Sequence, residues 1–219
     1  PGGRRDGSVA SIAVRTTTEW AADDRADLSV LRGGPLPAPP GAPVQGGLFD
    51  EPEPQPAASL TADVDIVDVR EQGRVGGARF GELVHAMLAA SPLGATRDQF
   101  DGTALVQARI LGATDEERRA AVEAVLRVSA HDLLQRAASA DARGEARREC
   151  PVTVTAADGS LVEGVIDLAF LEGDTWTVVD FKTDREISQE GLARYSRQVS
   201  LYATAIARAT GLTARAVLM

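Results

Sequence analysis

Two aspartates and one lysine could do chemistry together, because they stand on two neighbouring segments of the chain. Asp167 lies in the run G-V-I-D-L, and Asp180 and Lys182 lie in the run V-V-D-F-K-T. Turn-forming residues 172–175 separate the two apolar runs, which predicts a β-hairpin. In a simple hairpin around that turn, Asp167 falls directly opposite Asp180, with Cβ atoms about 4.5–5.5 Å apart. Strand alternation puts Lys182 on the same face as Asp180.

Such a cluster is suited to the hydrolysis of phosphodiester bonds. Two facing carboxylates repel each other unless a cation lies between them. Carboxylate oxygens with open coordination positions suit Mg²⁺ or Mn²⁺, and these ions polarise phosphate oxygens and lower the pKa of a bound water. A desolvated lysine beside them can hold or deprotonate the attacking water and neutralise charge in the transition state.

A surface salt-bridge cluster is the simpler interpretation of the same residues, and two observations weigh against it. The residues that flank Asp167 and Asp180 are apolar, which indicates strands covered on both faces. Lys182 is also the only lysine of the chain, which has 23 lysines and arginines in total. Arginine substitutes poorly where a compact cation must handle a proton, so a lysine at this position favours a catalytic role.

Hydrophobic periodicity predicts the elements that must position these residues. An apolar stripe at helical spacing predicts a helix over 79–90, and period-two alternation begins at about residue 149. The predicted elements are helices at 79–90, at about 103–111 and from 114 onwards, strands at about 149–155, 161–171 and 176–182, a helix at 189–210 and a strand from 214. This order predicts an α/β fold with a mixed β-sheet flanked by helices.

The first 75 residues differ in character from the rest. Residues 33–75 are rich in proline and glycine, which predicts a linker that is mostly disordered. Residues 1–32 are too short to bury a core, and we interpret them as a segment of a preceding domain, with Trp20 expected to dock on a neighbouring domain. The domain itself is predicted at residues 76–219. Since the chain starts without methionine and stops within an apolar run, we expect both ends to be cut points of a longer protein.

The two runs around Asp167 and Lys182 resemble the core of the PD-(D/E)XK nucleases, which have a restriction-endonuclease-like fold, and specifically the RecB-like members. Three other segments resemble the same family: the run GARFGELVHAMLAA with His85, the acidic residue Glu149 before Cys150-Pro151, and the Q-x-x-x-Y pattern of Gln198 and Tyr202. The order and spacing of these segments carry the resemblance, which covers residues 76–219.

The resemblance implies a role for each matching residue. The implied metal ligands are His85, Asp167, Asp180 and the carbonyl of Phe181. Lys182 would be the catalytic lysine. Gln198 and Tyr202 lie one helical turn apart and would orient the site or contact the DNA backbone.

Taken alone, three of these residues have plainer interpretations. His85 would more often be a histidine at the edge of a core, although the small Gly81 one turn earlier favours a ligand. Tyr202 continues the apolar stripe of its helix and could simply be core. Glu149 is either a residue of the metal site or the partner of an arginine in a structural salt bridge.

The family implies a Mg²⁺-dependent DNA nuclease, with Mn²⁺ able to substitute, and an exonuclease rather than an endonuclease. RecB-like domains commonly stand at the C-terminus of helicase–nucleases that process double-strand breaks for recombinational repair. We therefore expect a parent of the AddA or RecB type, with DNA and a helicase motor as partners. The alternatives are a stand-alone exonuclease of the same fold, of the phage or CRISPR-associated type, and a module that binds DNA or a partner without cutting.

Composition excludes several other functions. A net charge of −9 argues against capturing nucleic acid by charge alone, so we expect the motor to deliver the DNA. The single Cys150 excludes an internal disulfide and a four-cysteine iron–sulfur cluster, and is consistent with the cytoplasm. Lys182 lies outside any Walker A pattern, so no ATP site is expected. The sequence contains neither a signal peptide nor an apolar run of the ~20 residues that a membrane span needs.

Overall fold

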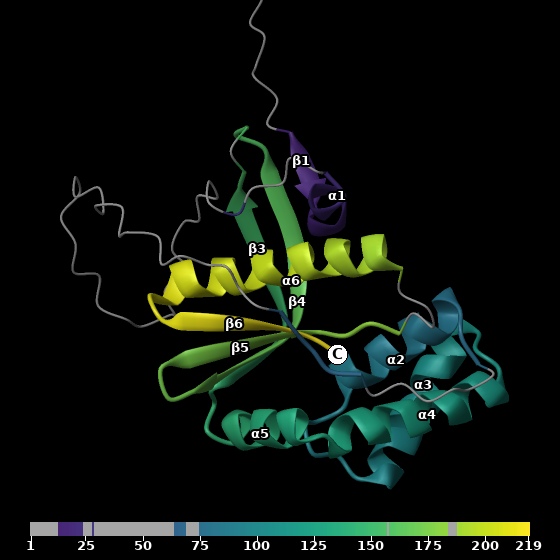
Figure 1. The fold of residues 1–219 in the computed structure, drawn as a ribbon. Coiled ribbons are helices and arrows are strands. Elements are labelled where there is room, and N and C mark those ends of the chain that lie inside the picture. Colours follow the sequence, from purple (N-terminus) through teal and green to yellow (C-terminus); the bar gives the residue numbers. More distant parts are fainter. Residues whose placement is uncertain (1–12, 24–27, 29–63, 69–74, 157, 184–187) are drawn as a thin grey trace, which may run out of the picture.

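The computed structural model describes residues 13–23, 28, 64–68, 75–156, 158–183 and 188–219. The helices are α1 (Thr17–Ala21), α2 (Ala78–Ala90), α3 (Arg97–Leu111), α4 (Asp115–Ala130), α5 (Asp132–Asp141) and α6 (Gln189–Thr210). The strands are β1 (Val14–Thr16), β2 (Val64–Ile66), β3 (Ala146–Thr155), β4 (Leu161–Glu172), β5 (Thr175–Asp180) and β6 (Thr213–Leu218). Figure 1 shows the mixed α/β architecture that the sequence predicts.

The strands of the described residues form one mixed sheet. Its order is β1-β4-β5-β6-β2, and β3 pairs with β4 beside this path. Strands β3, β4 and β5 form an antiparallel meander. Strand β6 runs parallel to β5, β2 runs parallel to β6, and β1 runs parallel to β4. The chain returns from β5 to β6 through α6, because parallel neighbours need a long crossover.

Strand β4 has a gap along one edge, and this gap decides where the site lies. Strand β3 pairs with one edge of β4 between residues 161 and 170. The opposite edge is shared, since β1 pairs with residues 161–163 and β5 pairs with residues 168–172. Within the described chain, residues 164–167 of that edge therefore lie between the two partner strands. Asp167 stands at the end of this gap that adjoins β5.

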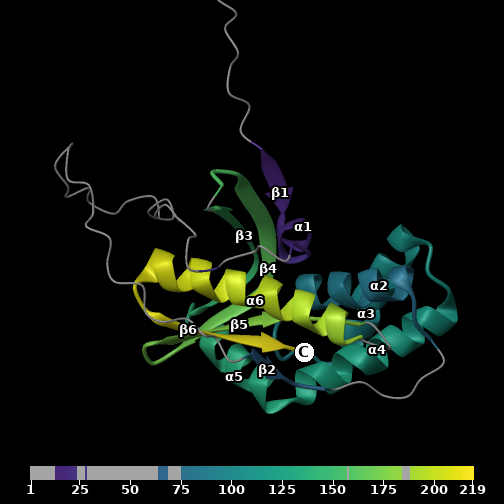
Figure 2. The same cartoon turned by 45° about the horizontal axis from the view of Figure 1, so that its top comes forward.

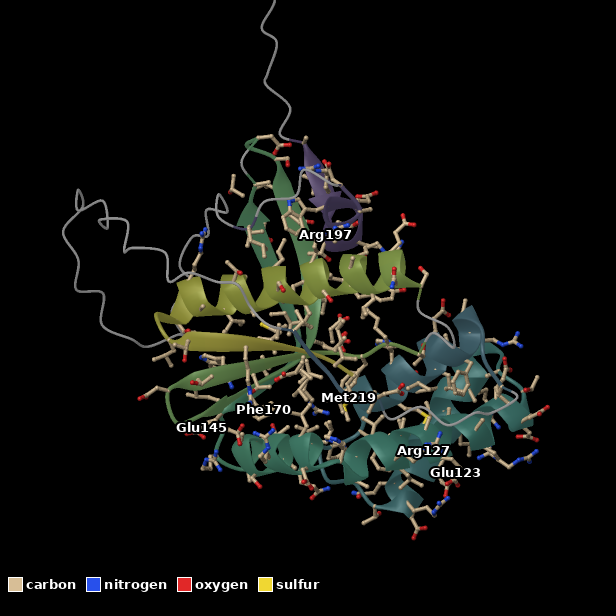
Figure 3. All side chains as sticks on the ribbon, viewed as in Figure 1. Glu123, Arg127, Glu145, Phe170, Arg197 and Met219 are labelled. Atoms are coloured by element: carbon tan, nitrogen blue, oxygen red, sulfur yellow. The ribbon has the colours of Figure 1, made fainter. Side chains whose placement is uncertain are left out.

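Helices cover both faces of the sheet. Figures 1 and 2 show α6 across one face and α5 against the other, with α2, α3 and α4 grouped to one side. Buried residues of α6 pack with those of β3, β4, β5 and β6 in one cluster. On the other face, Phe170 lies above α5 (Figure 3), and Phe170 and Met219 belong to one cluster with the buried residues of α5. Helices α2, α3 and α4 share a third cluster of their own.

The side chains of β3 and β4 change faces of the sheet at Glu149 and Asp167, which the register places opposite each other. Even-numbered residues of a regular strand share one face. On β4, however, Ile166 packs in the cluster with α6, whereas Leu168 packs in the cluster with α5. Glu149 has a left-handed backbone with φ 47°, which is uncommon for a residue other than glycine. The cross-strand register is the same on both sides of this point, so the strands twist without slipping.

The domain begins earlier in the sequence than the predicted boundary at residue 76. Strands β1 and β2 precede that boundary, yet both are strands of the same sheet. Trp20 of α1 is 2% exposed and lies in the cluster with α6, so the predicted docking of Trp20 is found against this domain. A strand of three residues is too short for a period-two pattern to predict it. Pairing with β4 holds β1, and burial of Trp20 in the cluster with α6 stabilises α1. The predicted linker falls almost entirely outside the described residues.

The predicted helix from residue 114 is two helices. Thr114 and Glu117 form the predicted capping box at the start of α4. Helix α4 ends at Ala130, and His131 then caps α5, with its Nδ1 accepting the N–H of Leu133 at 3.1 Å. This break turns α5 onto the sheet, where Leu133 is buried. No helix among the described residues has the length and apolarity to cross a membrane.

Candidate active site

The predicted hairpin has the predicted register. Leu168 pairs with Val179, and Leu171 pairs with Trp176. The turn itself is tighter than predicted, since Glu172 and Thr175 already pair and only residues 173–174 connect the strands. The ladder ends just before Asp167 and Asp180, which therefore stand opposite each other where the two strands part.

Asp180 and Lys182 form an ion pair at the end of β5. The side chain of Asp180 is almost wholly buried, and its Oδ2 lies 2.6 Å from Nζ of Lys182. Burial raises the pKa of the Asp180 carboxyl above its ordinary value, and the neighbouring ammonium opposes this shift. The cation is thus the group that compensates the buried carboxylate.

Asp167 has different partners, although it faces Asp180. Its Oδ2 accepts the backbone N–H of Phe181 at 2.8 Å, so the side chain reaches across the gap to the end of β5. The same oxygen lies 3.8 Å from Nδ1 of His85. Burial, and then the charge of Asp180, raises the pKa of Asp167 to about 7, against the hydrogen bond from Phe181. The surroundings of Asp167 therefore disfavour its ionised form, because Asp180 already carries a negative charge beside it.

His85 reaches Asp167 because α2 passes very close to the end of β5. A Cβ atom on Gly81, one turn before His85, would lie 2.6 Å from Oγ1 of Thr183. A larger residue at this position would require the Thr183 side chain or the helix to move, which agrees with the interpretation of Gly81 made from the sequence. The imidazole ring stands edge-on to the ring of Phe181, with centroids 6.5 Å apart. Phe181 thus contributes an N–H to Asp167 and a ring beside His85, while the role of its carbonyl stays a prediction.

Lys182 is held by α6 as well as by Asp180. Its Nζ lies 3.5 Å from Oε1 of Gln198 and 4.6 Å from the ring centroid of Tyr195. An ammonium over an aromatic face is attracted by the ring. Sequence reasoning did not single out Tyr195 and missed this contact. Its spacing of three residues from Gln198 is the signal that would have found it, since both lie on one helix face.

The Q-x-x-x-Y pattern forms a buried polar pair that leads away from Lys182. Nε2 of Gln198 donates to the hydroxyl of Tyr202 at 3.1 Å. That hydroxyl also lies 2.9 Å from Oγ1 of Thr17 in α1. Tyr202 is therefore more than a core residue, and Thr17 is a polar neighbour that sequence reasoning did not single out.

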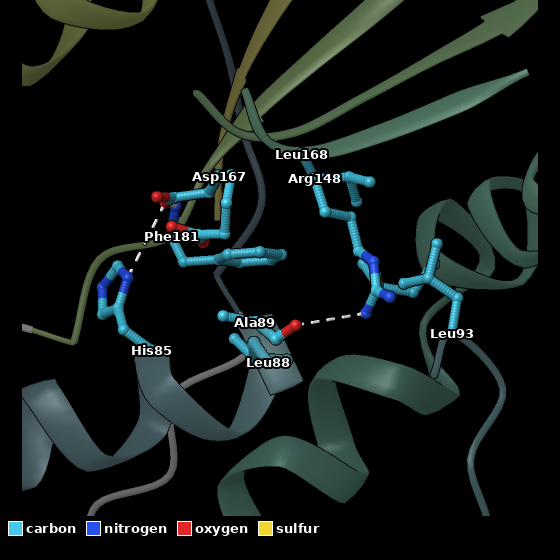
Figure 4. Close-up of a pocket in the computed structure, with 10 residues that line it drawn as sticks. His85, Leu88, Ala89, Leu93, Arg148, Asp167, Leu168 and Phe181 are labelled. Atoms are coloured by element: carbon cyan, nitrogen blue, oxygen red, sulfur yellow. Dashed lines mark hydrogen bonds and ion pairs between the residues drawn. The ribbon is translucent and has the colours of Figure 1, made fainter. Parts of the chain in front are cut away.

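Glu149 and Arg148 line a shallow, open hollow between α2 and the meander. His85 and Asp167 line the same hollow, as Figure 4 shows. The charge of Glu149 contributes to the raised pKa of Asp167, which places it near the acidic pair across β3 and β4. Arg148 donates to the carbonyl oxygens of Ala89 and Ser91, so it holds the end of α2 against the sheet.

The donor set fits a hard divalent cation, although the side chains are not gathered as ligands. Among the described residues, no group of three or more histidine, cysteine, aspartate or glutamate side chains is close enough to hold a metal ion. Asp167 and Asp180 nevertheless offer oxygen donors and His85 offers a nitrogen, and burial raises the pKa of both carboxyls in a way that a bound cation would oppose. Oxygen-rich sites of this kind suit Mg²⁺ or Mn²⁺.

Comparison with known proteins agrees with this geometry. A stretch of 54 residues is 50% identical to an ATP-dependent helicase/nuclease subunit from Carboxydothermus hydrogenoformans. It covers 23% of this chain and 5% of that protein, so the chain spans a small part of this relative. The family model of the PD-(D/E)XK nuclease superfamily matches residues 62–218 and thus includes β2. The fold, the hairpin and this match together confirm the resemblance found in the sequence: the chain belongs to the PD-(D/E)XK nuclease superfamily.

Proposed function

We propose that this domain hydrolyses phosphodiester bonds of DNA in a reaction that depends on Mg²⁺, with Mn²⁺ able to substitute. The observation that carries the proposal is a pair of opposed carboxylates, Asp180 buried and Asp167 partly buried, with the only lysine of the chain 2.6 Å from Asp180. A structural ion pair would need only one carboxylate, whereas this site has a second one with its pKa raised to about 7.

Asp167 and Asp180 would hold the ion, with His85 and the Phe181 carbonyl as further ligands and Glu149 beside them. When bound, the ion supplies charge that stabilises the phosphorane-like transition state and acidifies water. The ammonium of Lys182 would hold the attacking water and neutralise developing charge on the phosphate. Tyr195 and Gln198 would keep that ammonium in place.

The first test is loss of cleavage in single-site variants of the full chain. Asp180→Ala and Lys182→Ala should each lower Mg²⁺-dependent DNA cleavage by about 100-fold or more, because each removes a charge from the reacting centre. Asp174→Ala is the matched control, since Asp174 lies in the exposed turn of the same hairpin and should cut like the parent. If both site variants cut like the parent, the assignment is wrong, and a folded parent that binds DNA without cutting would favour a non-cutting module.

We further propose that the domain acts as the nuclease module of a helicase–nuclease that processes double-strand breaks, and that it is an exonuclease. Support comes from the similarity to the helicase/nuclease protein of Carboxydothermus hydrogenoformans. Linear DNA should be degraded and covalently closed circular DNA spared when both are offered to the protein with Mg²⁺. Equal cutting of both substrates would instead show endonuclease action.

A further inference from the structure

The hydrogen-bond chain that begins at Lys182 does not end within the Q-x-x-x-Y pattern. It continues from Tyr202 to Thr17, which lies 185 positions earlier in the sequence. Thr17 is 3% exposed and Tyr202 is 2% exposed, so water does not compete for either hydroxyl. Thr17 is the first residue of α1, directly after β1.

The ammonium of Lys182 sets the direction of this chain. An ammonium can only donate, so the atom of Gln198 that faces it is the amide oxygen, and the amide NH₂ faces Tyr202. The hydroxyl oxygen of Tyr202 accepts from that NH₂. The same hydroxyl shares a hydrogen bond with Oγ1 of Thr17 at 2.9 Å, in which either oxygen can be the donor. Thr17 therefore ends the chain as the hydrogen-bond partner that orients the phenol.

Three features position the segment that carries Thr17. Strand β1 pairs with β4 up to Thr16 opposite Glu163. Nε of Arg197 on α6 donates to the carbonyl of Ala21, the last residue of α1, at 2.7 Å (Figure 3). Gly164 leaves the space that Thr17 and Tyr202 fill, since a Cβ atom there would lie 2.6 Å from Cγ2 of Thr17 and 2.7 Å from the tyrosine hydroxyl.

We propose that Thr17 is a positioning residue of the nuclease site, which fixes Lys182 through Tyr202 and Gln198. The segment β1–α1, which precedes the predicted domain boundary, thus completes the site from outside the family's motif residues. This inference rests on the proposed function for its kinetic effect, but the geometry of Lys182 can be read without catalysis.

The test compares Thr17→Val, which keeps the shape and removes the hydroxyl, with Thr17→Ser, which keeps the hydroxyl. In the full chain with Mg²⁺ and linear DNA, Thr17→Val should lower kcat by about tenfold with little change in KM, because positioning acts on the reacting geometry. Thr17→Ser should stay close to the parent. Tyr202→Phe should lower kcat similarly, and the double variant Thr17→Val/Tyr202→Phe should be no worse than Tyr202→Phe alone.

A second measurement reads Lys182 directly and needs no activity. Because Lys182 is the only lysine, an amine-specific acylating reagent labels one side chain, and the N-terminal amine of the same chain serves as the internal reference. Labelling of Lys182 relative to that amine, followed by mass spectrometry, should rise about threefold or more in Thr17→Val, while Thr17→Ser keeps the parental ratio. The midpoint of urea unfolding shows that each variant is folded under the assay conditions.

The outcomes separate this inference from the proposed function. A parent that does not cut, with Thr17→Val still raising the labelling of Lys182, would defeat the proposed function and keep the positioning role. A parent that cuts, with Thr17→Val and Thr17→Ser indistinguishable in both measurements, would overturn the positioning role. Effects of Thr17→Val and Tyr202→Phe that multiply would also overturn it, since two members of one chain cannot act independently.

Discussion

At the scale of single residues, the two carboxylates of the site differ in how closely a positive charge approaches them. Asp180 has an ammonium beside it, whereas Asp167 has a backbone N–H and a more distant imidazole. The pKa of Asp167 at about 7 follows from burial first and from Asp180 second. With its pKa raised in this way, the Asp167 carboxyl holds a proton more readily than a free aspartate does, and a bound metal ion would compete with that proton.

This arrangement predicts a pH dependence of stability. The pKa of Asp167 is higher in the folded than in the unfolded protein, so its stabilising contribution is complete below about 3.8 and is lost as pH rises through about 7. With a chelator present, the free energy of unfolding in urea should therefore fall between pH 5 and pH 8. In Asp167→Asn this fall should be smaller by on the order of 2 kcal/mol. Parallel curves for parent and variant would contradict the assignment of the shift.

At the scale of elements, the site exists because α2 approaches the end of β5 at Gly81. Gly81→Ala should push α2 away from Thr183, where the added Cβ would lie 2.6 Å from its Oγ1. DNA cleavage should fall by about tenfold or more, since ångström displacements of a site residue are costly. Gly102→Ala on α3 is the control, because nothing lies within 4 Å of that position. Thr183→Ala should restore much of the activity of Gly81→Ala, and failure of this rescue would place the effect elsewhere.

The docking of β1 and α1 makes a separate prediction about stability. Trp20→Ala should lower the free energy of unfolding by about 3–5 kcal/mol, because it removes a buried aromatic side chain from the main cluster. Val14→Ala on β1, where the residue is 55% exposed, should change it by less than about 0.5 kcal/mol. Equal, small effects of both variants would show that the segment is not part of the cooperative unit.

At the scale of the whole molecule, the net charge bears on the proposal that a motor delivers the DNA. The chain carries −9, so its long-range field repels the phosphate backbone. Without metal and at physiological salt, the 219-residue chain should bind a fluorescent DNA duplex no more tightly than about 10⁻⁵ M, and anisotropy titrations should show a shallow salt dependence. Tight binding that weakens steeply with salt would contradict delivery by a motor.

The local part of this protein was predictable from its sequence. The hairpin register, the facing aspartates, the lysine beside them and the turn between Gln198 and Tyr202 depend on period-two and period-3.6 patterns and on turn residues, which act over a few positions. The capping box at Thr114 is local in the same sense. These features need no knowledge of distant segments.

Only the tertiary structure decided which distant segments meet. The left-handed Glu149 and the twist at Asp167 accompany a change of packing partners on both faces at one point. Strand alternation placed Asp167 opposite Asp180 but did not predict that its side chain reaches the N–H of Phe181. Tyr195 contacts Lys182 because α6 crosses one face of the sheet, and Thr17 contacts Tyr202 because β1 pairs with β4. Such contacts depend on burial between segments far apart in the chain, where local patterns carry no information.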